Sequence, residues 1–184
     1  MNRLLILVVA ALGIFELHAQ NTQHVSNLEE QLKRLEEVDS LLLEYLPDTF
    51  EEYYALCGNS YSPLYHYEDI INHLYYSRSR TIDRKRLIEK IVSLSVGGVY
   101  YADHIAELHQ VAVETMRWHT HDIVSYLNKL SERENEGYWQ FIFGGIENRR
   151  LEYEDVAEVL SKQHQYKYYS SIKAGYNNSI VHTH

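Results

Sequence analysis

Polar and apolar residues repeat at helical spacing along residues 103–130. At 100° per residue, one side of the helix is acidic and polar and carries Asp103, Glu107, Gln110, Glu114, Arg117 and His121. The opposite side carries Ile105, Leu108, Ala112, Met116, His119 and Ile123. The spacing predicts one continuous amphipathic helix whose apolar side faces a core, with His119 buried and hydrogen-bonded there.

Helix signals recur through the rest of the chain. Two prolines in 184 residues leave room for long helices. Ser131 and Glu134 form a capping-box pattern, and Gly97-Gly98 reads as helix punctuation. The aromatic run from Tyr138 to Phe143 is typical of core. No alternating strand pattern of useful length occurs, so we expect a single compact all-α domain of six to eight helices.

The N-terminus has the layout of a secretory signal peptide over residues 1–19. Arg3 precedes a charge-free run from Leu4 to Phe15, and Ala19 is the small residue before Gln20. Cleavage leaves a mature domain over residues 20–184, with no integral membrane span. The sequence therefore predicts an exported protein, periplasmic or secreted.

Charge is unevenly distributed. The formal net charge is −9, which argues against nucleic-acid binding because phosphate contacts need Lys and Arg. The segment from about residue 164 is rich in Tyr, and its Lys167 and Lys173 are accompanied by no acid. We describe it as a Tyr- and Lys-rich C-terminal tail. It either folds back on the acidic body or offers a surface to a partner.

Signals for metal or catalytic chemistry are sparse. Asp69 and His73 are spaced i,i+4 and are the candidate metal ligands, although a solvated polar face explains them as well. The motifs for zinc, phosphate or serine-nucleophile sites do not occur. We expect no cofactor and no tightly bound metal. An enzyme would require two or more of a set of histidines to converge in one cleft: His66, His73, His104 and His109.

Acidic residues suggest an interaction surface. Asp103, Glu107 and Glu114 share one side of the amphipathic segment. We interpret them as part of a surface that binds a protein partner with a basic surface, steered by charge. An ordinary solvated face is the competing interpretation.

A faint resemblance covers about 50 residues. Val92-Ser93, Gly97-Gly98, Ala102-Asp103, Tyr138-Trp139 and Phe143-Gly144-Gly145 follow a pattern similar to that of small exported helical bacterial proteins. Some proteins of that kind are immunity proteins against secreted toxins. The resemblance implies no catalytic residues.

Three functions follow from these observations. The first is a cell-envelope protein that acts by protein binding, as an inhibitor or immunity protein. The second is a His-dependent envelope enzyme that uses a metal or cofactor. The third is a structural or assembly factor held by the leucine stripe from Leu28 to Leu42.

Overall fold

The computed structural model describes residues 35–58, 70–77, 82–100, 105–144, 153–162 and 166–181. In these ranges the chain forms nine α-helices and no strand, which confirms the all-α fold class. The count exceeds the six to eight expected. The helices are α3 (Leu35–Tyr45), α4 (Phe50–Cys57), α5 (Ile70–Tyr76), α6 (Arg84–Ser95), α7 (Ala106–Trp118), α8 (Thr120–Leu127), α9 (Glu132–Phe143), α10 (Tyr153–Ser161) and α11 (Tyr169–Val181). The expected signal peptide lies outside the described residues.

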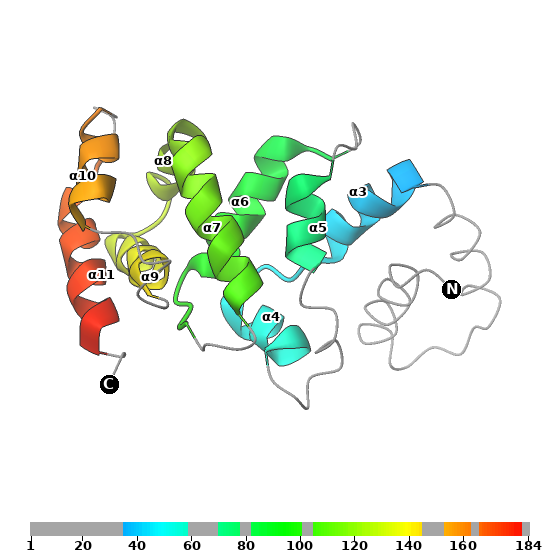
Figure 1. The fold of residues 1–184 in the computed structure, drawn as a ribbon, viewed down its shortest axis with the longest axis horizontal. Coiled ribbons are helices and arrows are strands. Elements are labelled where there is room, and N and C mark those ends of the chain that lie inside the picture. The colour runs from blue at the N-terminus through cyan, green and yellow to red at the C-terminus, as the bar shows by residue number, and fades with distance from the viewer. Residues whose placement is uncertain are drawn as a thin grey trace.

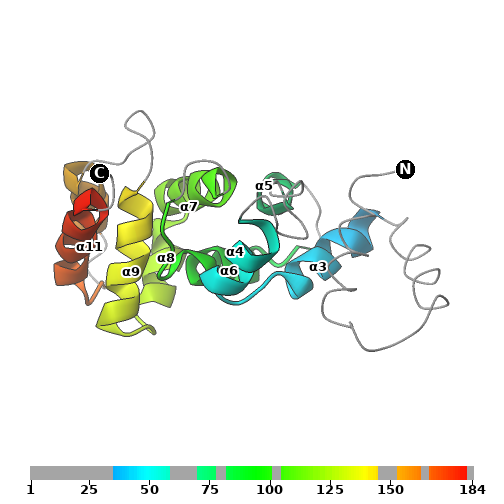
Figure 2. The same ribbon diagram turned by 90° about the horizontal axis from the view of Figure 1, so that it is seen from below.

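The helices follow one another along the long axis of the molecule, with α3 at one end and α10 and α11 at the other (Figure 1 and Figure 2). In the middle, α6 contacts α4, α7, α8 and α9. Ile91 and Val92 of α6, Leu108 of α7 and Leu127 of α8 are almost completely buried there. The central helices thus share one core, which the terminal helices extend.

The expected single helix over residues 103–130 is wrong: the chain forms α7 and α8, separated by a break at His119. There φ is −126° and ψ is 31°, outside the helical range. Thr115 and Thr120 donate their hydroxyls to the carbonyls of Val111 and Met116, at 2.6 and 2.7 Å. Such bonds to the preceding turn bend helices, and the hydroxyls here bracket the break.

The apolar side of the segment is buried as expected, except at His119. Leu108, Ala112, Met116 and Ile123 are at most 2% exposed. His119 is only half-buried, because it occupies the break between the two helices. The buried histidine is instead His109, whose Nε2 lies 3.2 Å from the carbonyl of Ile142.

Gly97 confirms that a helix ends at the Gly97-Gly98 pair, as expected. It follows the end of α6 and has a φ of +72°, a left-handed conformation that glycine adopts without strain. The backbone of this turn packs closely on α9. A Cβ added to Gly137 would lie 2.8 Å from the amide nitrogen of Gly97.

The aromatic run in α9 is core, as expected, and it contains a buried hydrogen-bond network. Trp139 Nε1 donates to the hydroxyl of Tyr166 at 2.7 Å, and that hydroxyl donates to Asn135 Oδ1 at 2.7 Å. Asn135 Nδ2 in turn donates to the carbonyls of Leu127 and Ser131, both at 2.9 Å. The network joins α9 to the end of α8 and to the segment preceding α11.

Residues 166–181, within the expected tail, hold a helix that packs on α9 more extensively than any other pair of described helices. Small side chains permit the close approach. Ser171, Gly175 and Ser179 recur every four residues on the buried side of α11. A Cβ on Gly175 would lie only 2.5 Å from the Cβ of Trp139. Close packing therefore holds this helix in place.

The lysines of this region contribute little to that packing. Lys167 and Lys173 are exposed. Lys162 pairs with Glu158 at 3.0 Å, four residues earlier on the same surface. Exposed pairs of this kind contribute at most about 1 kcal/mol.

Two buried tyrosines allow a matched test of the network. Tyr166→Phe leaves Trp139 Nε1 and Asn135 Oδ1 without a partner, so we expect the free energy of unfolding to fall by about 1–3 kcal/mol. The Tyr138 hydroxyl is buried and has no hydrogen-bond partner among the described residues. Tyr138→Phe should therefore leave stability unchanged or raise it. Urea unfolding of both variants provides the measurement, and equal losses would contradict the assignment.

Candidate functional site

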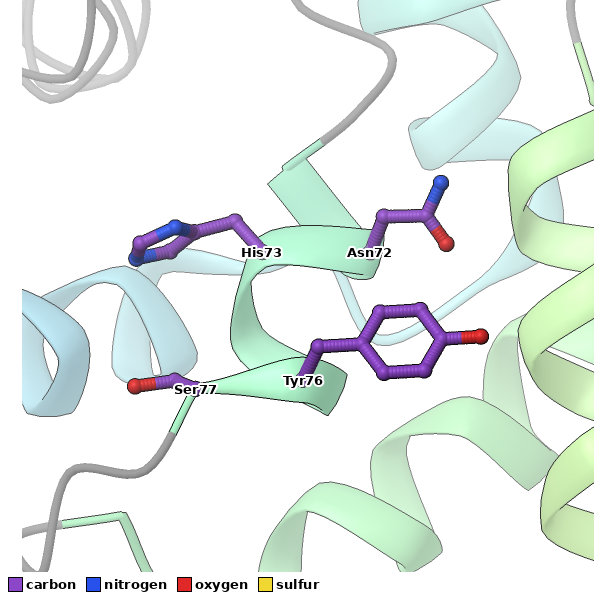
Figure 3. Close-up of a pocket in the computed structure, with 4 residues that line it drawn as sticks. All are labelled: Asn72, His73, Tyr76 and Ser77. Atoms are coloured by element: carbon purple, nitrogen blue, oxygen red, sulfur yellow. The ribbon is translucent and has the colours of Figure 1, made fainter.

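Polar side chains project from two sides of α5, around an open depression of about 480 Å³. His73 and Ser77 point to one side, whereas Asn72 and Tyr76 point to the other (Figure 3). Residues four apart lie one above the other on a helix, which explains the pairing. The two sides have different partners and different chemistry.

On the first side, His73 and Ser77 converge on Asp39 of α3; we call these three residues the Asp39 cluster. Asp39 is 4% exposed. Its Oδ1 lies 2.8 Å from His73 Nε2, and its Oδ2 accepts the Ser77 hydroxyl at 2.5 Å. Both oxygens of a buried carboxylate are therefore occupied, and the cluster ties α3 to α5.

The Asp39 cluster lacks the geometry of a serine nucleophile. In that chemistry the hydroxyl donates to the imidazole, which acts as base, and the carboxylate orients the imidazole. Here the Ser77 hydroxyl donates to the carboxylate, and His73 bonds to the same carboxylate. The arrangement supports a structural role.

The expected metal ligands are only partly described. Asp69 lies outside the described residues, and His73 is joined to Asp39 instead. In the part of the chain that the structure describes, no three His, Cys, Asp or Glu side chains gather as a metal site would require.

The histidine cleft expected for an enzyme is not assembled from its described members. His109 is buried among aromatic rings, with centroid distances of 4.9 Å to Tyr100 and 5.4 Å to Phe141. His73 is bound to Asp39 on α3, and His66 and His104 lie outside the described residues.

Two basic residues of this region donate hydrogen bonds to backbone carbonyls near helix ends. Lys90, buried in α6, donates to the carbonyl of Leu46 at 2.7 Å and pairs with Asp48, which fixes the connection after α3. Arg84 donates to carbonyls at the end of α5, at 2.9 Å for Tyr75, and also bonds to that of Ser77. Cations stabilise a helix C-terminus because its free carbonyls are partly negative.

On the second side of α5, Tyr76 reaches α7. Its hydroxyl donates to Glu114 Oε2 at 2.6 Å, while Gln110 Nε2 donates to Glu114 Oε1 at 3.3 Å. Burial and the hydrogen bond to Glu114 raise the pKa of the Tyr76 phenol, so the hydroxyl keeps its proton and remains the donor. Glu114 is half-buried and fixed in orientation.

Trp118, one turn beyond Glu114 on the same helix, is 77% exposed. Glu107, Glu114 and Trp118 fall within about 40° of one another around α7; we call them the α7 outer face. Tyr76, at 53%, is the next most exposed large apolar side chain in the described ranges. Of the expected partner-binding residues, Glu107 and Glu114 therefore lie on this face, and Asp103 lies outside the described residues.

Sequence reasoning missed Trp118, although a signal was present. On the same helical wheel Trp118 falls among the acidic residues rather than on the apolar side. A large aromatic residue on a polar helix face has no core to enter. Its neighbour Arg117 is also exposed but points about 100° away around the helix.

No family model matches the chain, and neither a curated protein nor a solved structure matches it. The resemblance to immunity-type proteins therefore remains a proposal. None of the helices in the described ranges combines the length and the apolar character that a bilayer crossing requires.

The charge around Trp118 can be measured directly, because the only other tryptophan, Trp139, is fully buried. A carboxylate about 6 Å away attracts cations by roughly 0.7 kcal/mol in water before screening. At pH 8 and low salt we expect cesium to quench the fluorescence about twofold better than iodide, relative to free tryptophan amide. Glu114→Gln should remove most of this preference. A preference for iodide would mean that Arg117 dominates.

Proposed function

We propose that this chain is an exported cell-envelope protein that acts by binding another protein through the α7 outer face, as an inhibitor or immunity protein does. The observation that carries the proposal is the exposure of Trp118. A tryptophan can bury about 150–250 Å² on association. At about 25 cal/mol per Å², that is a gross contribution of roughly 4–6 kcal/mol, part of which is lost to the cost of association.

Trp118 also has the surroundings of a binding anchor. Tryptophan, tyrosine and arginine are the residues most enriched among those that dominate binding energy. Tyr76 is exposed beside Glu114, and Glu114 lies one turn from Trp118. A rigid helix thus presents aromatic surface next to a fixed carboxylate.

The net charge of −9 favours a partner with a basic surface. Long-range attraction raises the association rate of oppositely charged surfaces, and salt weakens it. Glu107 and Glu114 supply negative charge on the α7 outer face itself.

The alternative functions have less support. An enzyme would use the Asp39 cluster, yet both carboxylate oxygens there are already committed to His73 and Ser77. An assembly factor would expose the leucine stripe of its first helix. Leu42, the end of that stripe, is 2% exposed and belongs to the core.

Binding through the α7 outer face is tested by a photo-crosslinking residue at position 118, with position 45 as the control. Tyr45 is an exposed aromatic on α3, away from α7 (Figure 1). We expect a crosslink to one envelope protein from position 118 alone. With that partner purified, Trp118→Ala should weaken binding by about 2 kcal/mol or more, roughly 30-fold in Kd. Tyr45→Ala should leave Kd unchanged.

Both variants should keep the melting temperature of the parent protein, because both side chains are exposed. Equal weakening by Trp118→Ala and Tyr45→Ala would contradict docking through α7. So would a partner that crosslinks from position 45 only.

Export rests on the pattern of residues 1–19 and has its own test. We expect the protein recovered from the cell envelope to begin at or near Gln20, because signal peptidase cleaves after small residues such as Ala19. N-terminal sequencing or intact-mass measurement detects the cleavage. Recovery from the envelope with Met1 intact would contradict it.

A further inference from the structure

We propose that Glu114, together with Tyr76 and Trp118, forms a subsite for an arginine side chain of the protein partner. This inference rests on the proposed function and assigns the chemistry of its central contact. We call these three residues the arginine subsite. The guanidinium would lie against the Trp118 ring and donate to the Glu114 carboxylate.

The carboxylate of Glu114 is oriented in advance. Tyr76 donates to one oxygen at 2.6 Å, and Gln110 donates to the other at 3.3 Å. A carboxylate can accept about four hydrogen bonds, so acceptor capacity remains on both oxygens. A partner that binds here does not have to order the side chain first.

The aromatic rings supply the second half of the subsite. Residues four apart on a helix are neighbours, so the spacing of Glu114 and Trp118 allows an indole ring and a carboxylate to meet one ligand. Cations bind the face of an indole, and arginine does so most often because its planar guanidinium stacks. Stacking also leaves the edge of the guanidinium free to donate to a carboxylate.

The geometry of its donors favours arginine over lysine. Arginine carries five N–H donors in a planar fork, whereas lysine is a compact point charge.

Two basic residues of the described ranges, Arg117 and Arg84, lie near this region. Arg117 is exposed, and it lies about 100° from Trp118 and about 60° from Glu114 around α7. Arg84 bonds to the carbonyls at the end of α5. Within the described ranges neither arginine is bonded to Glu114, whose partners there are Tyr76 and Gln110.

The test uses three labelled peptides of one sequence, Gly-Xaa-Gly-Xaa-Gly, with arginine, lysine or the uncharged isostere citrulline at Xaa. Fluorescence anisotropy measures each Kd on the mature protein at low salt. We expect the arginine peptide to bind with a Kd at least about tenfold below that of the citrulline peptide and about threefold below that of the lysine peptide. No saturable binding of the arginine peptide at millimolar concentration would overturn the proposal.

Glu114→Gln keeps an acceptor for Tyr76 but removes the charge, and Glu154→Gln on α10 is the matched control. Glu154 is exposed and lies in α10, at the end of the molecule that carries α11 (Figure 1). Each of the two variants removes one negative charge, so they differ only in where the charge is lost. Glu114→Gln should raise the Kd of the arginine peptide about fivefold or more. Trp118→Ala should have a similar effect, and Glu154→Gln none. Equal effects of the two Glu→Gln variants would show diffuse attraction and overturn the subsite.

The last measurement uses vesicles of anionic phospholipid. It is included because Arg117 is exposed next to Trp118 and could bind a lipid phosphate. If Trp118 emission shifts to the blue on vesicles and the arginine peptide does not bind, Trp118 contacts lipid and the proposal is wrong. The outcomes also separate the subsite from the proposed function. If Trp118→Ala abolishes partner binding while the three peptides bind equally, the docking face stands and the arginine subsite falls.

Discussion

The Tyr166 hydroxyl is the point on which the C-terminal half of the molecule depends. It accepts a hydrogen bond from Trp139 and donates one to Asn135, and Asn135 then satisfies a carbonyl at the end of α8. Each of these groups is buried, so each would be costly without its partner. Burial raises the pKa of the Tyr166 phenol, which keeps the proton that the donated bond requires. Tyr166 thereby joins α9 to the segment before α11, and Asn135 joins α9 to the end of α8.

Features that depend on a few neighbouring residues could be predicted from the sequence. The Ser131 capping box is present, with both reciprocal bonds formed between Ser131 and Glu134. Gly97 ends α6 in a left-handed conformation, and the aromatic run of α9 is buried. In each case the determinant lies within one helical turn, or in the periodicity of one segment. The all-α fold class follows from such local signals.

Some features depend on side chains that compete for backbone carbonyls, or on partners far away in the sequence. These features could not be predicted in this way. The break at His119 arises where threonine hydroxyls bond to carbonyls of the preceding turn, and the apolar periodicity runs through it unchanged. The pairing of His73 with Asp39 spans 34 residues and two helices. Of the candidate site, the sequence indicated Glu107 and Glu114, and the helical wheel also placed Trp118 away from the apolar side. The contact of Tyr76 with Glu114 spans 38 residues and two helices, so no local pattern could predict it.

The small-residue contact between α11 and α9 has a consequence for the order of folding. Trp139 and Phe143 of α9 are covered by α11: Gly175 lies against Trp139, and the Tyr176 ring contacts that of Phe143 at a centroid distance of 5.2 Å. These two rings therefore have no cover on this side until α11 has formed and docked. Pairings between distant segments also form slowly, because the intervening chain must be ordered first. Docking of α11 is therefore the step that completes the core of the C-terminal half.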